Sequence, residues 1–232
     1  MNRLQSELHR LYLLPSGGSL IDGSGEVRAM VVELARPADW DVLGPMWRGV
    51  QADLQLPAPA IAVSGTDGLQ LWFSLQEPVS APRAAEFLAR LRSSYLAGVA
   101  TGRMRLLPSA TGGSHGAALV PAQHEPTGNW SAFVAPDLAP VFANTPWLDI
   151  QPGVEGQADL LARLQSIKPA AFDAAMQRLQ PGVPQASPPE ASPPEAPSPD
   201  VDPRRFLQQV LNDDTVALAL RIEAARALLH GR

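Results

Sequence analysis

The sequence contains no cysteine among its 232 residues. This absence excludes disulfide bonds, catalysis by a thiol, and zinc or iron–sulfur sites with cysteine ligands. No run of about 18 consecutive apolar residues is present either, so no transmembrane helix is expected. Charges at Arg3, Glu7 and Arg10 interrupt the apolar positions of the N-terminus, which therefore does not resemble a signal peptide. We expect a cytoplasmic protein with no membrane partner.

Positive charge is scarce, since Lys168 is the single lysine and the formal net charge is -5. A surface that binds nucleic acid over its whole extent needs concentrated positive charge, and this balance argues against one. The other basic residues are arginines, which suit phosphate binding but also follow from GC-rich coding. With 45% hydrophobic residues, the chain can bury a sizeable core.

A proline-rich stretch divides the chain into parts. Residues 181–201 repeat Ser-Pro-Pro-Glu-Ala, a composition that predicts an extended, semi-rigid linker. Residues 1–180 precede it as the main domain, and residues 202–232 follow with two apolar stripes that predict a helical hairpin. A piece of about 30 residues cannot bury a core alone. It is expected to dock on the main domain, self-associate or bind a partner.

Within residues 1–180 the hydrophobic pattern predicts an α+β domain. A hairpin joins the second and third expected strands, which excludes a doubly wound nucleotide-binding fold. We predict a mostly antiparallel sheet with helices on one face. The expected elements are a helix (2–13), a strand (27–35), a helix interrupted by Gly44 and Pro45 (36–54), two strands (61–79), a helix (80–96), three short strands (103–109, 117–121, 130–134) and two helical pieces divided near Pro169 (157–179).

The hairpin of residues 61–79 carries a Gly-rich turn in which two glycines flank Thr66 and Asp67. A turn of this kind can direct successive backbone N–H groups at an anion. It can also be an ordinary loop built from preferred turn residues. Gln70 and Trp72 then share one face of the second strand, where they would line a groove or face solvent.

Two carboxylates, Asp39 and Asp41, lie two residues apart. On a strand face this spacing can hold Mg²⁺ for phosphoryl transfer. At the start of a helix the same residues serve as caps and complement the dipole. His115 and His124 lie nine residues apart in a loop-rich stretch, and surface loop positions are the simpler interpretation than a metal site.

Two arginines, Arg103 and Arg105, alternate on the strand expected at 103–109 and would project from one sheet face. There they would meet either phosphate or solvent.

The sequence "VSGTDGLQLWFSL" resembles the central hairpin of archaeo-eukaryotic-type primases, including primase-polymerases and plasmid replication primases. The order of the expected elements and the segment "LLPS" are similar to the same family, over roughly residues 27–120. The hairpin positions that fit are Ser64, Gly65, Gly68, Gln70, Trp72 and Phe73. The chain departs from the family at two places. Ala35, two residues after Glu33, stands where the second acid of an acid-x-acid pair is expected, and Gln70 replaces a nucleotide-contacting histidine.

The resemblance implies DNA replication in a plasmid, phage or other mobile element, with nucleic acid or replication proteins as partners. An active domain would use Mg²⁺ or Mn²⁺ as a nucleotidyltransferase, and a degenerate one would bind nucleic acid without polymerising it. The implied catalytic residues are Glu33, Asp39 and Asp41, with Asp39 and Asp41 as metal ligands. The implied nucleotide or nucleic-acid contacts are Ser64, Asp67, Gln70, Arg103 and Arg105.

A second hypothesis is a non-enzymatic adaptor or oligomerisation protein. In that case the linker would present the C-terminal helices to a partner or to a second copy of the chain. The acidic net charge and the linker favour it.

Overall fold

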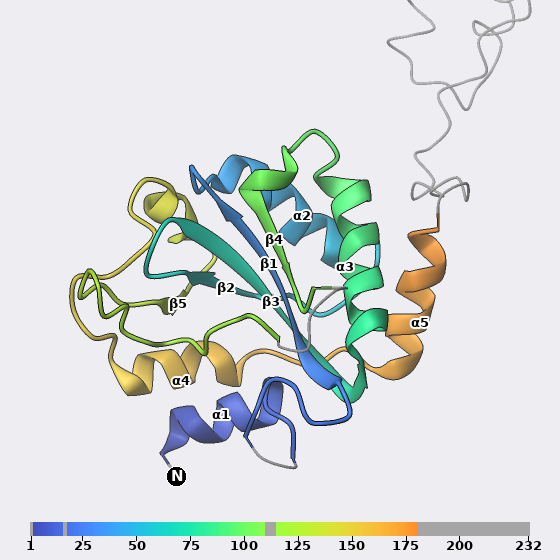
Figure 1. Ribbon diagram of the computed structural model, residues 1–232, viewed down its shortest axis with the longest axis horizontal. Helices are drawn as coiled ribbons and strands as arrows, with labels where there is room; N and C mark the ends of the chain where they lie inside the picture. The colour runs from blue at the N-terminus through green and yellow to red at the C-terminus, as the bar shows by residue number, and fades with distance from the viewer. Residues whose placement is uncertain (1, 16–17, 110–114, 181–232) are drawn as a thin grey trace, which may run out of the picture. The chain divides into compact units, whose positions relative to one another are not determined.

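The computed structural model describes residues 2–15, 18–109 and 115–180 (Figure 1). The linker expected at 181–201 and the helical hairpin expected at 202–232 lie outside the described residues. Within the described ranges, no helix has the length and apolar character needed to cross a membrane.

A five-stranded sheet in the order β4-β1-β3-β2-β5 forms the centre of the described fold. Every neighbouring pair of strands is antiparallel, which confirms the predicted α+β class. The strands are β1 (Glu26–Ala35), β2 (Ala60–Val63), β3 (Gly68–Ser80), β4 (Met104–Leu107) and β5 (Ala132–Val134).

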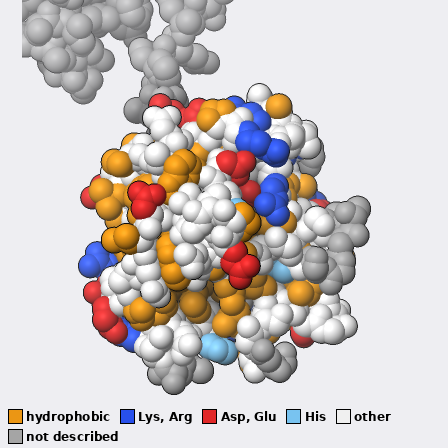
Figure 2. All heavy atoms as spheres, turned by 60° about the vertical axis from the view of Figure 1, so that its left-hand side comes forward, with side chains coloured by type: hydrophobic (Ala, Val, Ile, Leu, Met, Phe, Trp, Pro, Cys, Tyr) orange, Lys and Arg blue, Asp and Glu red, His pale blue; other side chains and the backbone are white. Residues whose placement is uncertain are grey.

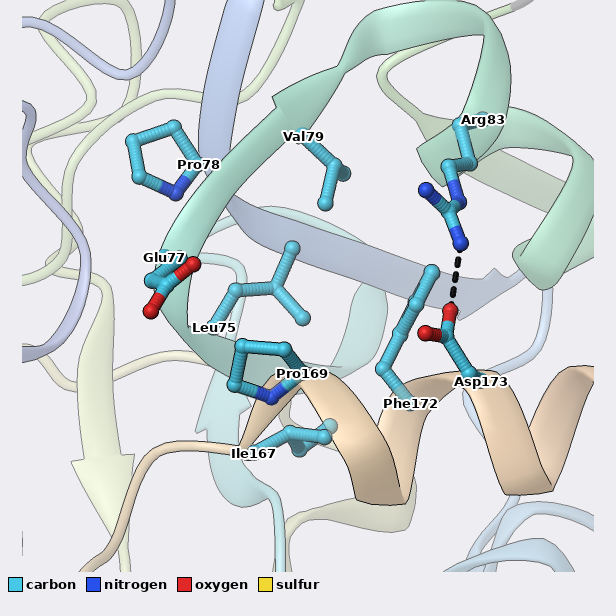
Figure 3. Close-up of a pocket in the computed structure, with 9 residues that line it drawn as sticks. All are labelled: Leu75, Glu77, Pro78, Val79, Arg83, Ile167, Pro169, Phe172 and Asp173. Carbon is cyan, nitrogen blue, oxygen red and sulfur yellow. Dashed lines mark hydrogen bonds and ion pairs between the residues drawn. The ribbon is translucent and has the colours of Figure 1, made fainter.

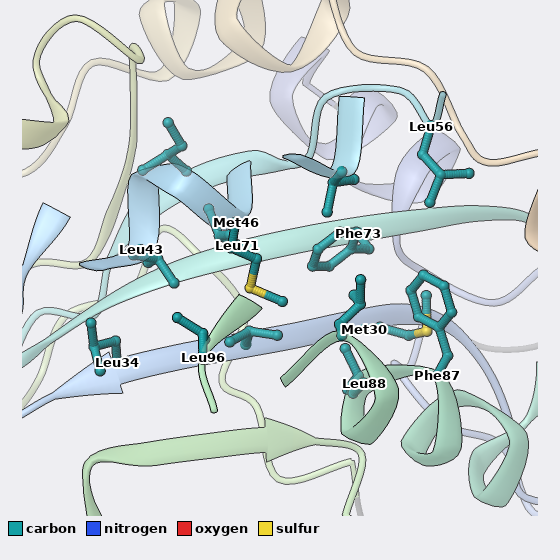
Figure 4. Close-up of a cluster of buried hydrophobic side chains, with 14 of the residues drawn as sticks. Met30, Leu34, Leu43, Met46, Leu56, Leu71, Phe73, Phe87, Leu88 and Leu96 are labelled. Carbon is teal, nitrogen blue, oxygen red and sulfur yellow. The ribbon is translucent and has the colours of Figure 1, made fainter. Parts of the chain in front are cut away.

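Helices cover both faces of this sheet, so the prediction of helices on one face is wrong. Met30 and Val32 of β1 pack in one hydrophobic cluster with α2, α3 and α5. Figure 4 shows Met30 with side chains of α2 and α3. Ala29 and Val31 pack in a second cluster with α1 and α4. Because β1 is buried on both sides, it reads as a nearly continuous apolar run. The helices are α1 (Arg3–Leu11), α2 (Trp40–Ala52), α3 (Ala81–Tyr95), α4 (Val154–Ala162) and α5 (Pro169–Arg178), with 3₁₀ turns η1 (Thr101–Arg103) and η2 (Ala139–Ala143).

Helix α2 runs without a break through Gly44 and Pro45, so the predicted interruption is wrong. Proline lacks an N–H and forfeits one helical hydrogen bond, which in the second turn leaves the rest of the ladder intact. Asp39 stabilises the start, because its side chain accepts hydrogen bonds from the backbone N–H groups of Asp41 and Val42 at 3.0 and 3.2 Å.

The strand predicted at 117–121 is not formed, although Val120 is buried. One edge of the sheet, at β5, is already occupied by a side chain. The Gln157 amide accepts from the Phe133 N–H at 2.7 Å and donates to the Phe133 carbonyl at 2.9 Å. A buried glutamine thus takes the hydrogen bonds that a further strand would make there.

Candidate functional site

A polar network crosses three adjacent strands, from the edge strand β4 through β1 to β3. Register places Glu33 of β1 opposite Gln70 of β3 on one side and Arg105 of β4 on the other. Gln70 Nε2 donates to Glu33 Oε2 at 2.6 Å, and Arg105 Nη1 donates to Glu33 Oε1 at 3.3 Å. Trp72 Nε1 donates to Gln70 Oε1 at 2.8 Å. The sheet therefore brings together three of the residues singled out from the sequence, each from a different strand.

Burial explains why the network is fully paired. Glu33 is 4% exposed and Gln70 is 7% exposed, whereas the Arg105 side chain is 56% exposed. A buried carboxylate without partners is costly, and here both oxygens accept hydrogen bonds. Arg105 thus balances the charge of Glu33 while its outer side remains in contact with solvent.

Gln70 faces neither an open groove nor solvent, the two alternatives left by the sequence. Its neighbour Trp72 is 1% exposed and packs edge-on against Tyr12, with ring centroids 5.2 Å apart. Burial raises the pKa of the Tyr12 hydroxyl. This face of β3 is an interior layer beneath α1.

The Gly-rich turn between β2 and β3 satisfies most of its own hydrogen bonds. Ser64 Oγ accepts from the Thr66 and Gly68 N–H groups at 3.1 and 2.9 Å. Gly65, at φ +81°, donates its N–H to the Pro146 carbonyl at 3.0 Å. A Cβ at Gly65 would lie 2.8 Å from the Ser131 nitrogen, so glycine is required there. These three N–H groups are therefore committed within the protein instead of being directed at an anion.

Three arginines lie where the chain leaves β1 and enters β4, and we call Arg36, Arg103 and Arg105 the arginine rim. Arg103 belongs to η1 and not to a strand, and its Nη2 donates to the Pro37 carbonyl at 2.8 Å. Arg36 Nη2 donates to the Gly102 carbonyl at 2.8 Å. Each guanidinium has five N–H donors, so donors remain for a ligand.

An acidic side chain, Asp67, lies beside the arginine rim. The Arg36 side chain is 65% exposed, and its Nε lies 3.9 Å from the exposed Asp67 carboxylate. Figure 2 shows Lys or Arg side chains gathered beside acidic ones on one face of the molecule. Arg36 is not among the residues singled out from the sequence, and its place directly after a buried strand was the available signal.

The carboxylates of Asp39 and Asp41 occupy a helix start. One oxygen of Asp39 is engaged with two backbone N–H groups of α2, and Asp41 is exposed in its first turn. Within the described ranges no group of three or more His, Asp or Glu side chains could hold a metal ion. Metal binding by Asp39 and Asp41 stays a prediction.

His115 is buried, contrary to the expected surface loop position. Its Nε2 lies 2.7 Å from the Ala29 carbonyl oxygen, and in the described part of the chain its Nδ1 has no hydrogen-bond partner. Burial lowers the pKa of His115, and the hydrogen bond to Ala29 opposes this effect. His124 lies at a turn instead, with Nδ1 3.1 Å from Thr127 Oγ1.

A separate cavity of about 140 Å³ lies beside α5 (Figure 3). Arg83 forms an ion pair with Asp173 across it and lies over the Phe172 ring, 5.5 Å from the centroid. These two charges neutralise each other, so the pair joins α3 to α5 and offers little to a charged ligand.

No protein-family model and no curated protein sequence matches this chain. The solved structures that are similar to it include the following two. The primase-polymerase AEP domain of cyanophage S-2L is 21% identical over 62% of this chain and 68% of that chain, with a TM-score of 0.34. The polymerase domain of Mycobacterium tuberculosis ligase D, solved in complex with DNA, is 19% identical over 73% of this chain and 56% of that chain, with a TM-score of 0.29.

Proposed function

We propose that this chain is a replication-associated nucleic-acid-binding protein of a mobile element, with a primase-like domain that does not polymerise. The observation that carries the proposal is the pairing of Glu33 with Arg105. Where the primase family places an acid-x-acid pair for metal, this strand offers one carboxylate already neutralised by an arginine, followed by Ala35.

The exposed guanidinium groups support nucleic-acid binding. Arg36 and Arg105 keep 65% and 56% of their side chains exposed. Arginine binds phosphate through paired hydrogen bonds, and neutralising phosphates releases counterions. The acidic net charge of -5 limits this contact to a local surface, because the rest of the molecule repels a polyanion.

The lone carboxylate supports loss of polymerisation. Two-metal phosphoryl transfer needs several carboxylates that share the ions. Asp39 and Asp41 are the further ligands proposed for Mg²⁺ or Mn²⁺, but one Asp39 oxygen already accepts two hydrogen bonds from α2. Primer synthesis by the full chain with Mg²⁺ or Mn²⁺ and nucleotides, lost in Asp39→Ala plus Asp41→Ala, would contradict this part of the proposal.

The binding part is tested with the full chain and a fluorescent 12-nucleotide DNA strand at low salt. Arg36→Gln plus Arg103→Gln should weaken binding several-fold, because two phosphate contacts are removed. Arg48→Gln is the matched control, since Arg48 is an exposed arginine on α2. Melting curves must show that all three proteins remain folded. Equal affinity of the three proteins would contradict binding at the arginine rim.

A further inference from the structure

One end of the sheet brings together side chains that lie far apart in the sequence. In the strand order β4-β1-β3-β2-β5, this end carries Arg103 just before β4, Arg36 just after β1, the β2–β3 turn, and Trp130 two residues before β5. Neighbouring strands are about 4.8 Å apart, so the four steps from β4 to β5 span about 19 Å. A single strand of several nucleotides can span that length.

Two tryptophans are held beside the β2–β3 turn by backbone hydrogen bonds. Trp130 and Leu148 exchange two of them, at 2.8 and 3.0 Å. Gly65 donates to the carbonyl of Pro146, the residue before Trp147, at 3.0 Å. A Cβ at Gly65 would lie 3.1 Å from the Trp130 carbonyl carbon. The positions of Trp130 and Trp147 are therefore fixed relative to the turn.

The packing of these tryptophans differs from that of their neighbour. Leu148 packs against the core cluster formed with α2 and α3. Trp130 and Trp147 are only partly buried and, in the described part of the chain, belong to neither hydrophobic cluster. Large aromatic rings normally gain most of their free energy by burial in a core. Trp130 and Trp147 instead stay partly exposed, at the same end of the sheet as the arginine rim.

We propose that Trp130 and Trp147 form a base-stacking surface for single-stranded nucleic acid, a proposal that rests on the proposed function. Bases of one strand would stack on these rings while the phosphates of adjoining nucleotides reach the arginine rim. Figure 1 places the β2–β3 turn and β5 on its left, and Figure 2 brings that side forward, with Lys or Arg side chains on it. A duplex hides its base faces, so the surface selects single strands.

The test measures the affinity of the full chain for a 12-nucleotide thymidine strand and for an abasic strand of equal length. Trp130→Ala and Trp147→Ala should each weaken thymidine binding by about 5- to 150-fold, the range expected for loss of one stacked base. Binding to the abasic strand should change little, because its phosphates are intact. Trp130→Phe and Trp147→Phe should recover most of the affinity, since each retains an aromatic face.

The outcomes separate this proposal from the one on which it rests. If the arginine variants weaken binding but the tryptophan variants bind thymidine as wild type does, the stacking surface is refuted and the proposed function stands. If wild type binds neither strand at low salt, both proposals fail. Equal losses on the thymidine and abasic strands, without recovery in the phenylalanine variants, would show a structural role for the tryptophans and overturn the stacking proposal.

Discussion

At the scale of single residues, the hydrogen bonds of Glu33 determine whether this face of the sheet can bind a metal ion. Its two oxygens accept hydrogen bonds from Gln70 and Arg105, at 2.6 and 3.3 Å. A carboxylate in this state is a structural partner, and a metal ion would have to displace a guanidinium to reach it. The charge that a divalent cation would supply comes instead from a side chain of the same sheet.

Removal of Arg105 should therefore destabilise the fold. Arg105→Gln leaves the Glu33 charge buried with one partner, and we expect a loss of about 1–3 kcal/mol in the free energy of unfolding. Glu33→Gln combined with Arg105→Gln should recover part of this loss, because no buried charge remains. Urea unfolding of the three proteins measures the difference. A double variant less stable than Arg105→Gln would contradict the pairing.

His115 should make stability depend on pH. Burial lowers its folded pKa below the unfolded value of about 6.5, so the unfolded chain binds the proton more readily. The contribution of neutral His115 to the free energy of unfolding is then fully present above about pH 6.5. It falls as the pH decreases toward the folded pKa and levels off below it. Urea unfolding between pH 7.5 and 5.5 should show this fall in wild type and a flatter profile in His115→Gln. Parallel profiles would refute the assignment.

The sequence pointed to several of these residues, but it did not predict which of them contact one another. Glu33 and Gln70 could be singled out from the hairpin pattern, whereas their contact depends on strand register, which is a tertiary property. The same limit applies to His115, because a histidine in a Gly-rich loop gives no local sign that it will be buried against Ala29. For Asp39 the sequence allowed two roles, a helix cap or a metal ligand, and the structure shows that it caps α2.

At the scale of elements, hydrophobic periodicity predicted most helices and strands. The helix around 80–96 and the hairpin around 61–79 were found close to their expected bounds, as α3 and β2–β3. The number of covered faces was missed, although the nearly continuous apolar run of β1 is the pattern of a strand buried on both sides. The strand expected at 117–121 does not form, because a short apolar run is not specific to a strand, and only Val120 of this run is buried.

Substitutions of Asp39, at the start of helix α2, distinguish its role as a helix cap from a role as a metal ligand. Asp39→Ala should cost about 1 kcal/mol of stability, because the cap on Asp41 and Val42 is lost. Asp39→Asn should cost little, since asparagine caps equally well but is a poorer metal ligand. Thermal unfolding in Mg²⁺ and in chelator checks both variants. Stabilisation of wild type by Mg²⁺ that is absent in Asp39→Asn would show that the residue binds metal.

At the scale of the whole molecule, charge is distributed unevenly. The net charge of -5 repels a polyanion, while the arginine rim gathers three guanidinium groups at one end of the sheet. Binding of a nucleic-acid strand at this local surface should be weak and sensitive to salt.

The salt dependence of binding to a 12-nucleotide single strand is the sharpest test of whether the arginine rim binds nucleic acid. For single strands the logarithm of the affinity falls with the logarithm of salt concentration by about 0.7 per phosphate contact. We expect a clear slope for the wild-type full chain, a slope shallower by about 1.4 for Arg36→Gln plus Arg103→Gln, and an unchanged slope for Arg48→Gln. No binding at low salt, or the same slope in all three proteins, would contradict a nucleic-acid site at the arginine rim.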